Sequence, residues 1–169
     1  MKTLYLVRHA KASLDNPLER DLDRPLIESG IKRTRQVIEY LHKKQASVDL
    51  ILSSPAVRAF ETASYIAHAL HYPTENIKIE RTIYTGDTDK IADLFYDLSK
   101  KIGSLMIVGH NPSITNFANL LLPEPIDYLP TSGLVCLQFE AKTWDEIWQA
   151  KIITNFVVSS RMIKDDKGE

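Results

Sequence analysis

Three short apolar runs, each followed at once by polar residues, constrain the fold of this chain most strongly. They cover residues 3–7, 49–52 and 105–108, and the segments that follow them are Arg8-His9, Ser53-Ser54-Pro55 and Gly109-His110-Asn111-Pro112. Runs of this length are typical of buried strands, and amphipathic helical periods lie between them. Strands that alternate with helices predict a mainly parallel sheet covered by helices on both faces.

The remaining segments extend this pattern to a three-layer α/β sandwich. Helical periods stand at residues 30–44, 59–70, 91–98 and 114–121, a weaker strand at 77–79, and two final strands at 134–139 and 148–156. A turn joins the last two runs, so we expect an antiparallel edge strand there. Ser54 and Asn111 each precede a proline, which predicts that they cap the helices that follow.

Length and charge limit what the chain can be. Its 169 residues fit one domain, which we place at residues 1–161, with a polar tail at 162–169. Twenty-one basic against 22 acidic residues give a formal net charge of −1, so neither a nucleic-acid partner nor a membrane partner is indicated. The first apolar run is too short for a signal peptide and no run approaches bilayer length, so we expect a cytoplasmic protein.

Sheets of this kind bind ligands beyond the carboxyl ends of their strands. Of the five histidines, only His9 and His110 stand at such ends. Arg8 precedes His9, and Arg58 falls near the start of a helix, where the helix dipole disfavours a cation by ~0.3–1 kcal/mol. We therefore expect these four side chains to converge on an anion. A phosphoryl group fits guanidinium forks together with helix amides.

A neutral imidazole is a nucleophile near pH 7 without any deprotonation. We therefore predict that His9 attacks phosphorus, while a backbone carbonyl accepts a hydrogen bond from its other ring nitrogen and fixes the tautomer. His110 is predicted to donate to the equatorial oxygens as charge shifts onto them. No pair of histidines has metal-ligand spacing and Cys136 is the only cysteine, so no metal site is predicted.

The same motifs resemble those of the histidine phosphatase superfamily: Leu6-Val7-Arg8-His9-Ala10, residues 53–62 around Arg58, and Val108-Gly109-His110-Asn111-Pro112. More narrowly, Arg8-His9-Ala10-Lys11-Ala12 and Asp21-Leu22-Asp23-Arg24-Pro25-Leu26 with Gly30 are similar to SixA-type phosphohistidine phosphatases. The resemblance implies a phosphoglycerate mutase-like fold and no metal or cofactor. It also implies a phosphate pocket of Arg8, His9, Arg58 and His110, with His9 phosphorylated during turnover.

Larger members of this superfamily carry a glutamate after the third strand as general acid, and Glu80 is the only nearby candidate here. An alkoxide leaving group, whose parent acid has a pKa near that of water (~15.7), needs such a proton donor. An imidazole, with a pKa of ~6.5, departs far more easily. We therefore predict a phosphatase that removes phosphoryl groups from phosphohistidine on a signalling or phosphocarrier protein.

Other interpretations stay open at this point. Asp23 and Arg24 either form a solvated loop salt bridge or line the pocket and contact the substrate. A phosphomonoesterase for a small phosphorylated metabolite would use the same pocket with Glu80 as its acid, and a non-catalytic phosphate-binding module would keep the pocket without turnover. Each motif alone has a structural explanation, but their joint occurrence at three strand ends favours a functional site.

Overall fold

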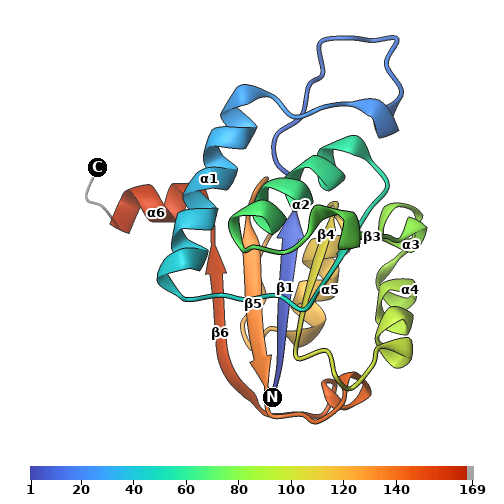
Figure 1. Ribbon diagram of the computed structural model, residues 1–169, viewed down its shortest axis with the longest axis vertical. Coiled ribbons are helices and arrows are strands. Elements are labelled where there is room, and N and C mark those ends of the chain that lie inside the picture. Colours follow the sequence, from blue (N-terminus) through green and yellow to red (C-terminus); the bar gives the residue numbers. More distant parts are fainter. Residues whose placement is uncertain (167–169) are drawn as a thin grey trace.

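The computed structural model describes residues 1–166 of the chain, and the side chains of residues 1–163 (Figure 1). The strands are β1 (Lys2–Arg8), β2 (Leu50–Ser53), β3 (Lys78–Ile79), β4 (Ser104–Gly109), β5 (Leu134–Phe139) and β6 (Ile152–Val158). The α-helices are α1 (Glu28–Lys43), α2 (Val57–Ala69), α3 (Arg81–Thr85), α4 (Thr88–Asp93), α5 (Ser113–Leu121) and α6 (Ser160–Asp166). Short 3-10 helices are η1 (Asp21–Asp23), η2 (Thr74–Asn76), η3 (Leu94–Asp97) and η4 (Trp144–Glu146).

The strands form one sheet in the order β3-β2-β4-β1-β5-β6. β1 pairs in parallel with β4, and β2 pairs in parallel with both β4 and β3. β5 pairs antiparallel with β1, and the edge strand β6 pairs antiparallel with β5. The predicted mixed α/β sheet is therefore confirmed, and β5, which runs against all the others, lies one place in from the edge.

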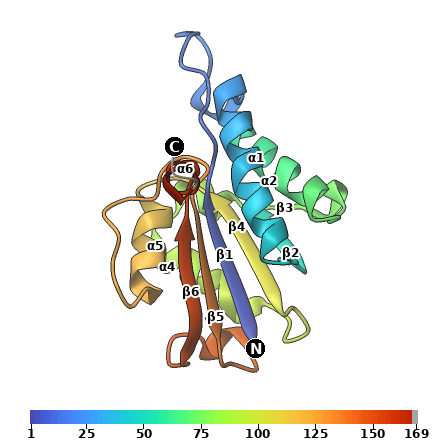
Figure 2. The same ribbon diagram turned by 90° about the vertical axis from the view of Figure 1, so that its left-hand side faces the viewer.

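Alternate side chains of the central strands fill two hydrophobic cores, one on each face of the sheet. In β1, Leu4 and Leu6 belong to one core, whereas Tyr5 and Val7 belong to the other. Figure 2 shows α1 and α2 on one side of the sheet and α4 and α5 on the opposite side. Because both faces are covered, these strands are apolar along their whole length, which is why the sequence revealed them.

The two predicted helix caps are wrong. If Ser54 and Asn111 were the caps, the helices would begin at Pro55 and Pro112. Instead, α2 begins at Val57 and α5 at Ser113. Oγ of Ser54 accepts the N–H of Ala56, which precedes α2, and also lies against Nε2 of His110, while the amide of Asn111 donates to the carbonyl of Leu129. Both side chains thus make tertiary contacts at the polar edge of the sheet that the local pattern does not predict.

The end of the chain also differs from the prediction. The last strand begins at Ile152 because residues 144–150 form η4 and the turn that follows it. Trp144 of η4 is buried and donates from Nε1 to the carbonyl of Ile102 at 2.8 Å. α6 crosses the boundary predicted between domain and tail, and its Ile163 packs against the core under α1. Residues 167–169 of that tail lie outside the described residues. None of the helices in residues 1–166 has the length and apolar character needed to cross a bilayer.

Candidate active site

The carboxyl ends of the parallel strands β1, β2 and β4 meet at one edge of the sheet. His9 follows β1, Arg58 is the second residue of α2, and His110 follows β4. The N–H of His9 donates to the carbonyl of Gly109 at 3.0 Å, which ties two of these strand ends together. A cavity of about 340 Å³ opens there, and its walls include Arg8, His9, Lys11, Arg24, Arg58, His110, Asn111 and Thr131.

The ring of His9 is held in one tautomer. It is 9% exposed, and its Nδ1 lies 2.7 Å from the carbonyl oxygen of Ala10. Because a carbonyl can only accept, Nδ1 carries the hydrogen and Nε2 keeps its lone pair. Burial lowers the pKa of His9 to about 4. The charges of three nearby guanidinium groups also lower this pKa, and the hydrogen bond to Ala10 raises it by less than burial lowers it. The ring is therefore neutral at pH 7, and Nε2 is available as a nucleophile.

His110 stands beside His9, with ring centroids 5.1 Å apart. Its Nε2 lies 2.7 Å from Oγ of the fully buried Ser54, which also accepts the N–H of Ala56 at 3.2 Å. The buried Ser54 hydroxyl needs an acceptor for its hydrogen, and among the described residues Nε2 of His110 is the acceptor within reach. The serine therefore donates to Nε2, and His110 carries its own hydrogen on Nδ1. Burial and the neighbouring His9 lower the pKa of His110 to about 3, so this ring is also neutral at pH 7.

Two arginines supply N–H donors that the protein uses only in part. Arg58 is 5% exposed, and its Nη1 and Nη2 donate to the backbone oxygen and the carboxylate of Asp21 at 2.7 and 3.0 Å. Arg8 donates from Nη1 to the carbonyl of Leu129 at 3.1 Å. Both Nε atoms, and Nδ1 of His110, are buried without a hydrogen-bond partner in the described protein. The three residues that carry these atoms all line the cavity, and two guanidinium groups at one cavity favour an anion with several oxygen acceptors.

Asp21 and Tyr84 belong to this site, although the sequence analysis did not single them out. The carboxylate of Asp21 accepts hydrogen bonds from Arg58 at 3.0 Å and from Oη of Tyr84 at 2.8 Å. Burial alone would raise the pKa of Asp21, but these two bonds and the charges of Arg58 and Arg24 lower it to about 2. The ring of Tyr84 packs edge-on against His110 at a centroid distance of 5.4 Å. Asp21 therefore acts as an ionised anchor for Arg58.

Of the two loop residues predicted as pocket or substrate contacts, only Arg24 lines the cavity. Asp23 instead forms the solvated salt bridge that was the alternative, with Nε of Arg20 at 2.8 Å and 46% of its side chain exposed. Asp21 and Asp23 lie in the same short helix η1, which turns them to different sides. The sequence motif at residues 21–26 therefore indicated the right loop, but the sequence alone could not show which of its two aspartates contacts Arg58.

Glu80 does not line the cavity that contains His9. It precedes α3, and its backbone N–H donates to the carbonyl of Ser53 at 2.9 Å. Within the described residues its carboxylate takes part in no hydrogen bond or salt bridge. The geometry therefore gives no support to Glu80 as the general acid.

A threonine and a glycine fix the segment that follows β1. Oγ1 of Thr62 accepts the N–H of Ala10 at 2.9 Å and donates to the carbonyl of Arg58 at 2.7 Å, so one side chain joins this segment to α2. Gly30 lies against the backbone of Lys11, where a Cβ would collide with the carbonyl oxygen. Only glycine allows α1 to approach the segment so closely.

The cavity wall has the composition of an anion site. Among the described residues it holds four cations, Arg8, Lys11, Arg24 and Arg58, and no acid. No group of three or more histidine, cysteine, aspartate or glutamate side chains suited to a metal ion occurs in the described part of the chain. Cationic donors around a neutral imidazole can bind a phosphoryl group and orient it for transfer to nitrogen.

Comparisons with known proteins agree with this chemistry. The family model of the histidine phosphatase superfamily (branch 1) matches residues 4–92. Phosphohistidine phosphatase SixA of Escherichia coli (strain K12) is 23% identical over 121 residues, which cover 71% of this chain and 74% of SixA. An uncharacterized chloroplastic protein of Arabidopsis thaliana is 30% identical over 153 residues, 86% of this chain and 70% of that protein.

The fold itself also has a solved counterpart. The structure of the protein histidine phosphatase SixA complexed with tungstate matches with a TM-score of 0.80 at 21% identity. The match covers 95% of this chain and 99% of that one, so the two proteins share their fold over nearly their whole length.

Proposed function

Because this chain belongs to the histidine phosphatase superfamily, we propose that it is a phosphohistidine phosphatase that transfers the phosphoryl group to Nε2 of His9 and then to water. One observation carries the proposal. His9 is a buried, neutral imidazole whose Nδ1 is bonded to the Ala10 carbonyl, in a cavity lined by Arg8, Arg58 and His110. The substrate in this proposal is a signalling or phosphocarrier protein that bears phosphohistidine, and the cytoplasm is the expected location.

In the first step, the arginines bind the phosphoryl group and His9 attacks it. Arg8 and Arg58 both line the cavity that contains His9, and their guanidinium groups can donate hydrogen bonds to the phosphoryl oxygens. A bond forms between Nε2 of His9 and phosphorus while the N–P bond of the substrate breaks. The electron pair of that bond returns to the substrate imidazole, whose other nitrogen carries the proton, so neutral imidazole leaves.

In the second step, water attacks phosphorus and gives one proton to the solvent. The electron pair of the N–P bond returns to His9, which is released neutral with its hydrogen still on Nδ1. The hydrogen bond from Nδ1 to the Ala10 carbonyl, 2.7 Å long, stabilises the positive charge that the ring carries while it is phosphorylated. His110 donates from Nδ1 to a phosphoryl oxygen in both steps.

None of the described residues in the cavity wall is an acid, which supports a phosphohistidine substrate over an alkyl phosphate. Glu80 lies outside the wall, and Asp21, with its pKa near 2, is ionised at neutral pH. Without a proton donor, an alcohol would have to leave as an alkoxide, whose parent acid has a pKa of ~15.7. An imidazole leaves as a neutral molecule, so its departure needs no acid from the enzyme.

Turnover of a phosphohistidine protein and of alkyl phosphates by the same preparation tests the proposal. We expect kcat/KM to be at least about a hundredfold higher for phosphohistidine, the smallest contribution typical of a missing general acid. Glu80→Gln should leave both activities within about twofold, as should Glu75→Gln, a control at a nearby exposed glutamate. Faster alkyl phosphate cleavage, lost in Glu80→Gln but not in Glu75→Gln, would instead support the metabolite phosphomonoesterase.

A further inference from the structure

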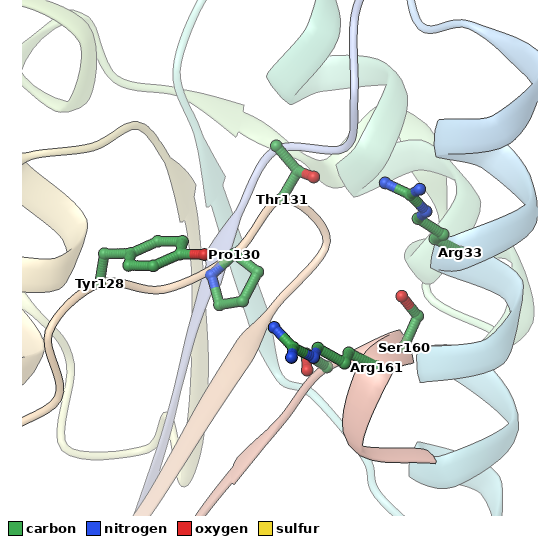
Figure 3. A pocket seen from close by; sticks show the side chains of 7 residues that line it. Arg33, Tyr128, Pro130, Thr131, Ser160 and Arg161 are labelled. Atoms are coloured by element: carbon green, nitrogen blue, oxygen red, sulfur yellow. The ribbon is translucent and has the colours of Figure 1, made fainter. Parts of the chain in front are cut away.

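A second cavity, of about 360 Å³, shares a wall with the cavity that contains His9. Figure 3 shows the side chains around it: Arg33, Tyr128, Pro130, Thr131, Ser160 and Arg161. They come from α1, from the start of α6 and from the loop between α5 and β5. Thr131 lines both cavities, so the second cavity adjoins the one that contains His9.

Two cations face this second cavity, and none of the residues described around it is acidic. The guanidinium groups of Arg33, on α1, and Arg161, on α6, are brought to the same space (Figure 3). No carboxylate among the described side chains lies within 4.0 Å of either group. Hydroxyl groups of Thr131 and Ser160 add further donors. Because like charges repel, this arrangement favours an anion that both guanidinium groups can bind.

The loop that separates the two cavities is fixed in position. The N–H of Ser132 donates to the carbonyl of His9 at 3.2 Å, and Oγ of Ser132 lies 2.9 Å from Oγ1 of Thr34 on α1. Arg8 binds the carbonyl of Leu129 in the same loop at 3.1 Å. The second cavity therefore has a set position relative to the nucleophile, as a subsite for a second group of one substrate requires.

We infer that Arg33 and Arg161 form a subsite for a carboxylate that the protein substrate carries beside its phosphohistidine. The inference rests on the proposed function, because a protein substrate must lay part of its surface over this edge of the sheet to reach His9. An acidic side chain in that surface would meet two guanidinium groups next to the catalytic cavity. Arg8 and Arg58 would then bind the phosphoryl group, while Arg33 and Arg161 would select the protein that carries it.

A set of phosphohistidine peptides tests the inference. Each peptide carries one glutamate at a different position near the phosphohistidine, and its kcat/KM is compared with that of the same peptide with glutamine. In the register that reaches the subsite, kcat/KM of the wild type should be about tenfold higher with glutamate. The double substitution Arg33→Gln and Arg161→Gln should remove this advantage and leave turnover of free phosphoimidazole, which has no second anion, unchanged. Lys32→Gln, a neighbouring exposed cation on α1 outside the cavity, should keep the advantage.

A charge swap sharpens the test. Arg33→Glu should prefer a peptide with lysine at the same register. If the double substitution lowered kcat/KM equally for the peptide and for phosphoimidazole, the effect would be structural and the subsite would be overturned. A wild type with equal kcat/KM for glutamate and glutamine peptides would also overturn it. A preference for a small molecule with two phosphates over every glutamate peptide would overturn the protein carboxylate as the ligand. Failure of the proposed function looks different, since the wild type would then cleave alkyl phosphates faster than any phosphohistidine compound, with or without glutamate.

Discussion

Several buried polar groups are paired within the protein at the edge of the sheet where β1 and β4 begin, whereas donors lack partners at the edge where they end. At the edge where β1 and β4 begin, Lys2 is 3% exposed, and its Nζ donates to the carbonyls of Lys100 and Ile102 at 2.6 and 2.7 Å. Nε1 of Trp144 also donates to the carbonyl of Ile102, and the carboxylate of Asp49 accepts two backbone N–H groups nearby. Each of these side chains finds its partners within the protein.

At the opposite edge, where β1 and β4 end, the protein leaves donors without partners. Nε of Arg8, Nε of Arg58 and Nδ1 of His110 are buried and make no hydrogen bond to the described residues. An unpaired buried donor costs about 1–3 kcal/mol, so this edge is stabilised when an anion binds. The comparison teaches that substitutions at the first edge should act on stability, whereas substitutions at the second should act on activity.

The largest effect is expected at the second edge. His9→Asn removes the nucleophile, so kcat/KM for a phosphohistidine protein should fall by about a thousandfold or more. The free energy of unfolding, measured in urea, should change by less than about 1 kcal/mol. His68→Asn, at an exposed histidine of α2, is the control and should alter neither quantity. Retained turnover in His9→Asn would contradict the claim that substitutions at the second edge act on activity.

Lys2→Met, at the first edge, should lower stability and leave activity unchanged. It removes two charge-assisted hydrogen bonds and leaves the carbonyls of Lys100 and Ile102 without their donor, so the free energy of unfolding should fall by about 2 kcal/mol. The kcat/KM of the folded enzyme should stay within about twofold of the wild type. Urea unfolding and steady-state kinetics on one preparation check both. A loss of activity at unchanged stability would break the comparison.

A smaller effect is expected at Ser54, which positions His110 without touching the substrate. Ser54→Ala removes the donor to Nε2 of His110, so kcat/KM should fall by about tenfold. Ser54→Thr keeps the hydroxyl group and should retain most of the activity. Nitrogen NMR of the wild type should show the His110 hydrogen on Nδ1. A hydrogen found on Nε2 would contradict the assigned tautomer.

The pH dependence of stability gives the smallest effect. The pKa values of His9, about 4, and of His110, about 3, lie below the 6.5 of an ordinary histidine. As pH falls from 6.5, the unfolded chain binds protons that the folded chain does not, so stability decreases by up to about 1.4 kcal/mol per pH unit for each histidine. His110→Gln should therefore flatten the slope measured by urea unfolding between pH 6.5 and 5. An unchanged slope would show that His110 is not held neutral.

The sequence predicted the central part of the site because position alone locates it. Arg8, His9 and His110 stand where apolar strands end, and Arg58 stands where a helix starts, so periodicity and the crevice rule for parallel sheets bring them together. The same reasoning predicted the sheet and the helices on both of its faces. These features follow from local patterns, and the structure places all four residues around one cavity.

The rest depends on contacts that no local pattern encodes. Asp21 reaches Arg58 and Tyr84 only because the loop after β1 folds back across the edge of the sheet. Ser54 has the local pattern of a helix cap, but a tertiary contact directs its hydroxyl to His110. Arg161 joins Arg33 because α6 packs near α1, far from it in the sequence. Such residues become visible only when distant segments are placed side by side.

The central claim is that Nε2 of His9 takes up the phosphoryl group. Enzyme mixed with a radiolabelled phosphohistidine protein, quenched in base within one turnover and analysed by mass spectrometry, tests it most directly. We predict an acid-labile phosphoryl group on His9 that appears before free phosphate and is absent in His9→Asn. Label on another residue, or full turnover while His9 never becomes labelled, would contradict the account.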